Sequence, residues 1–199
     1  MGFDMHKWMS VPFESAAVLG RDERAHFKAL SLTPDYLTHA TRGTAGAQIW
    51  LSDYGIELTR GFRALKVWMS IKAHGTTLYG KVIDMNVAQA RYLAELIDAS
   101  PELERTADRP LNIVCFRYIA PGLDDATLNT LNTELLLRLQ ESGVAVCSNA
   151  TIHDKYSLRM ANVNHRSTFA DFDLLAETVV QLGREIVREG MLQTETMGA

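Results

Sequence analysis

The sequence has no long run of apolar residues and no strong excess of one charge. No apolar stretch is long enough to cross a bilayer, so we expect no contact with a membrane. The 20 Lys and Arg residues against 24 Asp and Glu residues give a net charge of -4, and no basic stripe stands out. Without such a stripe the chain cannot neutralise phosphates, so we expect no nucleic-acid partner. With only 13 Gly and 5 Pro, and with 47% hydrophobic residues, collagen-like and disordered chains are excluded and a sizeable core is predicted.

Cysteine is also scarce, and the two cysteines have no partner motif. Cys115 and Cys147 each lie within an apolar run, which is typical of buried free thiols in a reducing compartment. A disulfide between them is the alternative interpretation. The first residues, MGFDMHKWM, lack the basic-then-apolar order of a secretory signal. We therefore expect a cytoplasmic protein.

An irregular stretch from about residue 30 to 52 separates a short strand-like segment from the helical part of the chain. It is rich in Thr, Ala and Gly, and Pro34 and Gly43 allow its backbone to rearrange. A loop of this length in a compact domain is usually a functional lid or is disordered. It carries Tyr36 and Leu37, which a plain linker does not need, so we predict a lid.

The remaining segments show regular periodicity. Apolar spacing predicts a helix that stops at Gly75 and a second helix over 77–99 that ends before Pro101, followed by a charged connection. Further on we predict a strand over 111–119, a helix capped by Asp124 or Asp125, two strands over 144–152 and 156–163, a last helix after Thr168 and a frayed tail over 191–199. This order predicts a small antiparallel sheet covered by helices on one face.

The pair His6-Lys7 is the first candidate for chemistry. A lysine amine is a nucleophile only when neutral, so a catalytic lysine needs a dry setting that lowers its pKa. The apolar residues that follow, Trp8, Met9 and Phe13 among them, could supply such a setting. The alternative is an exposed lysine with no special role.

The longer context of this pair resembles a known family. HKWMSVPFESA, then DYL within the irregular loop, then ELTRGFRALKVWMSIKAHG occur in this order, followed by NIVCFRY and DKYSLRMANVNHRST. Together they resemble the C-terminal portion of the pyridoxal-5'-phosphate-dependent (PLP-dependent) group II decarboxylases. This family includes the aromatic-L-amino-acid decarboxylases. The likeness extends to about Gly190.

The resemblance implies a role for individual residues. Lys7 matches the family lysine that condenses with the cofactor aldehyde, and His6 matches a neighbour of the cofactor phosphate. Tyr36 matches the lid tyrosine that protonates the substrate α-carbon after carbon dioxide leaves; without the resemblance it would be read as a packing residue. Asp4 stands where members have Asn or Asp. The implied function is an amino-acid carboxy-lyase with PLP as cofactor, acting on an aromatic L-amino acid as a homodimer.

The resemblance also implies a fold and a division into domains. The expected fold class is α/β with an α+β C-terminal domain, as a fragment of a fold-type I PLP-dependent transferase-like enzyme. Residues 1–99 would form the C-terminal edge of the PLP-binding large domain, and 100–190 the small domain. The aspartate and histidine that hold the cofactor ring in the family have no counterpart here, so we expect the chain alone to be inactive. The alternative is a non-catalytic dimerisation module that retains the family fold.

The other polar residues are not assigned to the site. Arg60 and Arg63 match family positions and are expected to share a helix face, where they could clamp a carboxylate or phosphate. We favour the alternative, that they pair with Asp or Glu across a domain or subunit boundary. His39 is expected to be solvated. No histidine spacing indicates a metal ligand set, so we predict no metal.

Overall fold

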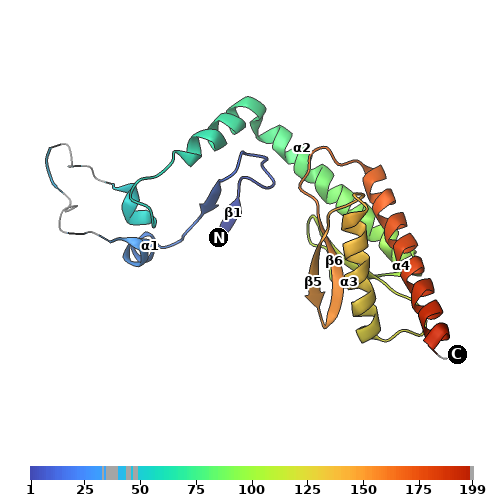
Figure 1. Ribbon diagram of the computed structural model, residues 1–199. Helices are drawn as coiled ribbons and strands as arrows, with labels where there is room; N and C mark the ends of the chain where they lie inside the picture. Colours follow the sequence, from blue (N-terminus) through green and yellow to red (C-terminus); the bar gives the residue numbers. More distant parts are fainter. Residues whose placement is uncertain (33, 35–39, 44–45, 47–48, 198–199) are drawn as a thin grey trace. The chain divides into compact units, whose positions relative to one another are not determined.

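The computed structural model describes residues 1–32, 34, 40–43, 46 and 49–197. The chain divides into two compact units, Met1–Thr76 and Thr77–Ala199. Figure 1 shows the elements along the chain. Among the described residues, no helix combines the length and the apolar character needed to span a membrane.

The first unit begins with a short hairpin and a capped helix. Strands β1 (Gly2–Asp4) and β2 (Ala16–Val18) pair antiparallel, with Phe3 opposite Ala17. Helix α1 (Glu23–Leu30) follows, and the side chain of Asp22 caps it by accepting from the Ala25 amide at 3.0 Å. The short 3-10 helix η2 (Leu51–Tyr54) packs against α1. These bonds give the unit a framework of local contacts.

Helix α2 (Arg63–Ala99) is interrupted at Gly75, whose φ of 75° is left-handed. This confirms the helix stop predicted there, because glycine adopts this conformation without steric cost. The start of the helix differs from our prediction. Leu58 and Phe62 belong to the apolar spacing but lie before the helix and are exposed. Arg60 therefore precedes the helix, and the prediction that it shares a helix face with Arg63 is wrong.

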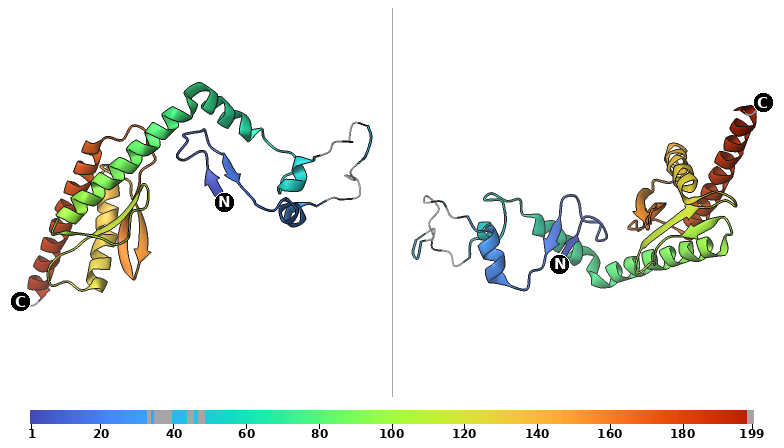
Figure 2. Two further views of the ribbon diagram at one scale, coloured as in Figure 1. Left: turned by 180° about the vertical axis from the view of Figure 1, so that it is seen from behind. Right: turned by 90° about the horizontal axis from the view of Figure 1, so that it is seen from below.

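The second unit is a sheet of four antiparallel strands in the order β3-β4-β6-β5. The strands are β3 (Leu103–Arg105), β4 (Ile113–Tyr118), β5 (Ser148–Ile152) and β6 (Lys155–Ala161). Helices α3 (Asp125–Glu141) and α4 (Phe169–Met197) lie side by side, as Figure 2 shows. Asp124 caps α3 through the Thr127 amide, which confirms one of the two predicted caps.

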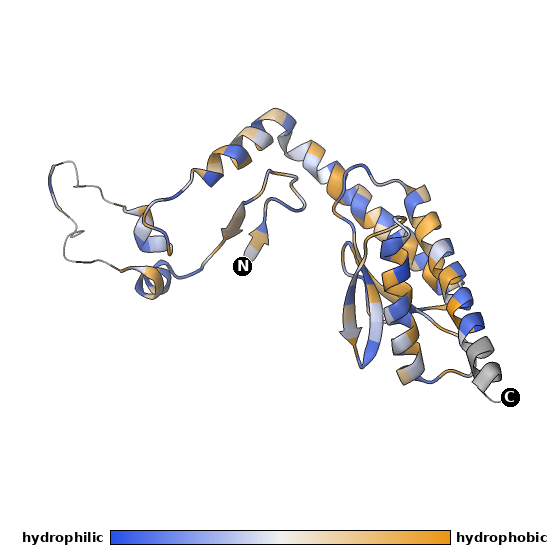
Figure 3. Cartoon of the chain, in the orientation of Figure 1, coloured by the Kyte–Doolittle hydropathy of each residue, from blue (hydrophilic) through white to orange (hydrophobic). Residues whose placement is uncertain are grey.

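The core of the second unit lies between the helices and one face of the sheet. Apolar side chains from the later part of α2, from α3 and from α4 form one cluster with the sheet residues Val114, Phe116 and Leu158. Each fully buried leucine of this cluster contributes about 1.5–3 kcal/mol relative to an exposed one. Apolar and polar residues alternate along α3 and α4, as expected for helices with one wet face (Figure 3). The predicted antiparallel sheet with helices on one face is confirmed.

Buried amide side chains join α2 to the segment that leads into α4. Asn86 donates to the carbonyl of Asn164 at 3.0 Å, and Gln89 donates to the carbonyl of Ser167 at 2.5 Å. Asn162 donates in turn to the Gln89 side chain at 2.7 Å. This amide network satisfies polar groups that would otherwise be costly inside the core.

Two further elements differ from the sequence prediction. Strand β3 lies in the segment we expected to be a charged connection: Glu104 stands opposite Arg117 of β4 and pairs with it at 2.7 Å, so the charges are satisfied within the sheet. The backbone of α4 continues as helix to Met197, beyond the end predicted at Gly190. Residues 77–99 pack in the second unit. The assignment of 1–99 and 100–190 to two domains of a larger enzyme stays a prediction.

Candidate functional site

The predicted lysine lies in the loop between β1 and β2, which we call the hairpin loop (residues 5–15). Backbone bonds shape its first half: the Lys7 amide donates to the carbonyl of Asp4 at 3.3 Å, and the Ser10 amide donates to the carbonyl of Lys7 at 3.1 Å. Val11 is buried and its amide donates to the carbonyl of Met5 at 3.3 Å. The loop is therefore folded back on itself and presents Lys7 at a defined place.

His6 is held by Ser15 at the far end of the hairpin loop. Its backbone amide donates to the Ser15 carbonyl at 3.2 Å. Its ring Nδ1 lies 2.7 Å from the same carbonyl oxygen and 3.2 Å from the Ser15 amide. A proton on Nδ1 would be donated to the carbonyl, whereas an unprotonated Nδ1 accepts from the amide. The edge of the Phe13 ring packs against the imidazole, with centroids 4.9 Å apart. The imidazole is thus fixed in either tautomer.

The amine of Lys7 contacts the carboxylate that ends β1. Its Nζ lies 2.5 Å from Oδ2 of Asp4, and the Lys7 side chain is 63% exposed. The hydrogen bond from Lys7 lowers the pKa of Asp4 below its ordinary value. The dry, apolar setting considered from the sequence is not formed by the described residues, because the Lys7 side chain is 63% exposed and Phe13 is 80% exposed.

The other predicted catalytic residue lies elsewhere. Tyr36 falls outside the described residues, and so does His39. The structure therefore brings His6 and Lys7 together but does not place Tyr36. The proton-donating role of Tyr36 stays a prediction.

Arg63 contacts the hairpin loop. The favoured pairing with acidic residues is confirmed for Arg63, but its partners, Glu14 and Glu57, lie in its own unit. Its Nε and Nη2 donate to Oε1 of Glu14 at 2.9 and 2.5 Å, and its Nη1 donates to Oε2 of Glu57 at 3.0 Å. These bonds raise the pKa of Arg63, chiefly through Glu57 and then Glu14. Arg60 has a different role, because its Nη1 donates to the carbonyl of Leu51 at 3.1 Å.

A cavity of about 550 Å³ lies beside these contacts within the first unit. Its walls include Met5 and Ser15 at the two ends of the hairpin loop, Phe62 just before α2, and Arg63 and Val67 at the start of α2. The wall is mostly apolar, and its charged residues are Arg60 and Arg63.

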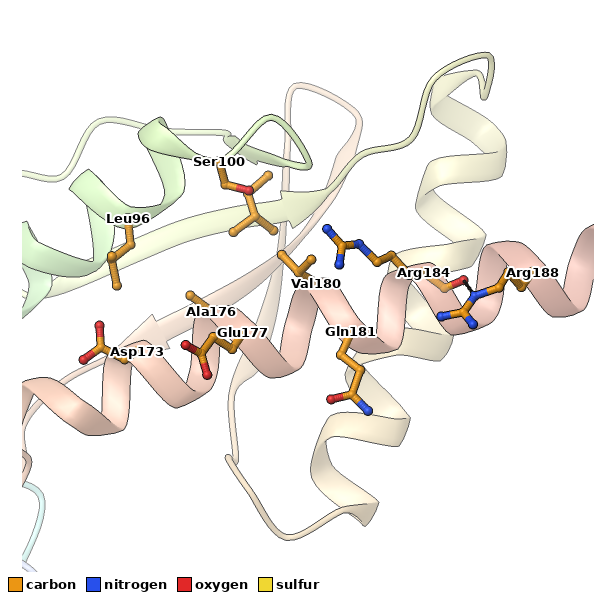
Figure 4. A pocket seen from close by; sticks show the side chains of 10 residues that line it. Leu96, Ser100, Asp173, Ala176, Glu177, Val180, Gln181, Arg184 and Arg188 are labelled. Atoms are coloured by element: carbon orange, nitrogen blue, oxygen red, sulfur yellow. Dashed lines mark hydrogen bonds between the residues drawn. The ribbon is translucent and has the colours of Figure 1, made fainter.

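The second unit has a groove of about 500 Å³ along α4, drawn in Figure 4. Apolar Leu96 and Val180 line it together with charged residues, of which Arg184 forms an ion pair with Glu102 at 2.5 Å. None of the predicted site residues lies in this groove. It is a feature of the second unit and not part of the lysine site.

Cysteines and acidic residues do not form a second centre within the described part of the chain. No group of three or more His, Cys, Asp or Glu side chains there could hold a metal ion. Cys115 and Cys147 are buried and free, which confirms the thiol interpretation. Burial raises the pKa of Cys147 to about 11, so this thiol is not a ready nucleophile.

The amino-acid sequence is similar to known decarboxylases. Residues 1–119 match the family described as "Pyridoxal-dependent decarboxylase conserved domain". Aromatic-L-amino-acid decarboxylase of Bacillus atrophaeus is 29% identical over 184 residues, which is 92% of this chain and 38% of that protein. Tyrosine decarboxylase 1 of Narcissus pseudonarcissus is 28% identical, over 80% of this chain and 32% of that protein. The chain thus spans about a third of the length of these relatives, 38% of the first and 32% of the second.

Solved structures show the same fold. Oryza sativa TDC with PLP and tryptamine superimposes with a TM-score of 0.81 at 23% identity, over 93% of this chain and 38% of that one. The glutamate decarboxylase domain of a Vibrio parahaemolyticus protein gives 0.69 at 27% identity, over 92% of this chain and 34% of that one. The expected mixed α/β fold of a PLP-dependent enzyme is therefore confirmed over most of the chain. The chain belongs to the pyridoxal-dependent decarboxylase family.

Proposed function

We propose that this chain is the part of a PLP-dependent amino-acid decarboxylase that supplies the cofactor-binding lysine, Lys7. The observation that carries the proposal is the presentation of Lys7 and His6 by a folded loop inside the segment that matches the family, residues 1–119. Family membership supports the reaction class, and the folded loop supports the choice of Lys7 and His6 as its residues.

The residues present fit an aldehyde-bearing, phosphorylated cofactor. The Lys7 amine is accessible, so an aldehyde can reach it, and the fixed ring of His6 lies next in sequence. Asp4 is placed 2.5 Å from the amine and pairs with its charged form. Because only the neutral amine attacks an aldehyde, the ammonium has to lose its proton to solvent, and the ion pair with Asp4 has to separate.

Lys7, His6 and Tyr36 each have one role in the proposed reaction. When bound, PLP supplies the electron sink for the carbanion that remains after carbon dioxide leaves. Lys7 would hold the cofactor in place, and His6 would bind its phosphate. Tyr36 donates a proton from its hydroxyl oxygen to the substrate α-carbon, and its loop excludes water while it does so. We propose an aromatic L-amino acid as the substrate, since the relatives named above include aromatic-L-amino-acid and tyrosine decarboxylases.

The proposal also covers the oligomeric state and the cellular location of the whole protein. We propose a homodimer located in the cytoplasm. Because the chain spans 38% of the Bacillus relative, we expect the chain alone not to form amine from amino acids. The second candidate, a non-catalytic dimerisation module, is favoured by one observation, the open and charge-paired environment of Lys7.

Covalent capture of PLP separates the two functions. The 199-residue chain is mixed with PLP, reduced with sodium borohydride and digested, and the pyridoxyl mass is located by peptide mass spectrometry. We expect the adduct mainly on Lys7, its loss in Lys7→Arg, and its retention in Lys28→Arg, a control that removes another exposed lysine. If the adduct is instead spread evenly over surface lysines and is unchanged in Lys7→Arg, the enzyme proposal is overturned. The non-catalytic dimerisation module is then the remaining candidate.

A further inference from the structure

Arg63 joins two segments that are distant in the sequence. It is the first residue of α2, and its Nε and Nη2 donate hydrogen bonds to Glu14 in the hairpin loop. The other side holds Glu57, which lies in the segment leading into the helix. Both donors meet the same oxygen, Oε1, so the carboxylate lies at the Nε–Nη2 edge of the planar guanidinium. The hairpin loop is therefore fastened to the start of α2 in one orientation.

The Arg63–Glu14 contact is connected to Lys7 through Ser15 and His6. Glu14 directly precedes Ser15, which is buried, and the backbone of Ser15 binds both the amide and the ring of His6. His6 in turn precedes Lys7. A movement of Glu14 would shift Ser15, and the two bonds of Ser15 would transmit that shift to the residue beside the amine.

Packing does not hold this part of the loop independently. The cavity of about 550 Å³ lies between Ser15 and Met5 on the loop side and Val67 on the helix side, so apolar contact is incomplete there. Arg63 is 35% exposed and Glu14 is 59% exposed, which makes each ion pair modest in strength. Glu57 holds the guanidinium on its other side, so that Arg63 is already oriented when it binds Glu14 of the loop.

From these contacts we propose that Arg63 is a positioning residue, which orients the hairpin loop and thereby the Lys7 amine. The inference rests on the proposed function of Lys7 as the cofactor-binding lysine. Arg63 touches neither Lys7 nor His6 in the contacts described above, so it acts through Glu14 and Ser15. Its partner arginine in the sequence motif, Arg60, bonds only a backbone carbonyl in those contacts and serves as the matched control.

The first test measures loop order without any cofactor. Hydrogen–deuterium exchange of the 199-residue chain is compared for wild type, Arg63→Gln, Arg63→Lys and Arg60→Gln. We expect exchange across residues 5–15 to rise roughly fivefold in Arg63→Gln, from the loss of two exposed ion pairs. Lysine keeps the charge but not the fork, so Arg63→Lys should be intermediate. Arg60→Gln should match wild type in this loop, and exchange in β4 should match in all variants, which reports that the chain remains folded.

The second test measures presentation of the amine. The rate at which borohydride-trapped pyridoxyl accumulates on Lys7 is followed, with Lys28 in the same digest as internal reference. We expect the ratio of Lys7 to Lys28 labelling to fall roughly fivefold in Arg63→Gln and to recover partly in Arg63→Lys, in step with the exchange. A general loss of structure would change both lysines and would not be rescued by the conservative variant.

The outcomes distinguish this inference from the proposed function. Unchanged exchange across 5–15 in Arg63→Gln overturns the positioning role, and so does faster exchange with an unchanged labelling ratio. If wild-type Lys7 is not labelled in preference to Lys28, the proposed function fails. In that case the exchange data still decide whether Arg63 orders the loop.

Discussion

Gly183 gives a substitution whose effect should be opposite to the one that helix propensity predicts. It lies in α4, where alanine is normally preferred over glycine. A methyl group at this position would stand 2.4 Å from Cγ and Cδ2 of the Tyr118 ring. Tyr118 is 3% exposed and its hydroxyl donates to Glu102 at 3.1 Å. Because Cγ is at the root of the side chain, rotating the ring does not remove the clash, and β4 has to move.

The size of the effect follows from two opposing contributions. Replacing glycine by alanine within a helix stabilises it by about 1 kcal/mol. Overpacking a well-filled core costs about 1–3 kcal/mol, and a contact this short belongs at the upper end. We therefore expect Gly183→Ala to lower the free energy of unfolding by about 2 kcal/mol.

Urea unfolding of the 199-residue chain, followed by far-ultraviolet circular dichroism, measures this difference. Gly190→Ala is the matched control, because Gly190 lies in the same helix and a methyl group there meets nothing within 4 Å. The control should be as stable as wild type or up to about 1 kcal/mol more stable. A Gly183→Ala protein at least as stable as wild type would refute the reasoning, since the close approach to Tyr118 would then carry no cost.

Three further predictions concern single groups of the second unit. Cys147, whose pKa burial raises to about 11, should react with iodoacetamide at pH 8 far more slowly in the folded chain than in urea; equal rates would contradict this. Asn132→Ala should lower the free energy of unfolding by about 3 kcal/mol in urea titrations, because the amide and carbonyl of Tyr118 lose their partner; a cost near zero would show that they find another. The hydrogen bond from Arg184 lowers the pKa of Glu102 below 4.5. The ion pair therefore stabilises the fold above pH 4.5, and this stabilisation is lost as the pH falls through the lowered pKa. Glu102→Gln should flatten the acid side of the curve of unfolding free energy against pH.

The sequence predicted those elements whose signals are local. Asp124 begins α3 because its carboxylate accepts from an amide of the first turn, and Gly75 interrupts α2 because its φ is positive. Both signals are contained in one or two residues. The helix stripes of the core belong to the same class, since periodicity over a few turns determines which face is buried.

Elements that depend on distant partners were missed. Strand β3 is charged, and its Glu104 is satisfied only by Arg117 and Lys155 from other strands, which propensity cannot reveal. Likewise the contact between Arg63 and Glu14 joins residues far apart in the chain. For the site, spacing alone could not choose Lys7 over other lysines; the resemblance of the surrounding residues did so.

The amide network of the second unit has a consequence for anyone who recombines this chain with its relatives. Gln89 on α2 and Asn162 before α4 complete each other's hydrogen bonds, and Gln89 also fixes the carbonyl of Ser167. A buried polar set that is only half complete is worse than none. Chimeras whose crossover separates residue 89 from 162–167 should therefore express poorly, whereas chimeras that take both parts from one parent should be tolerated.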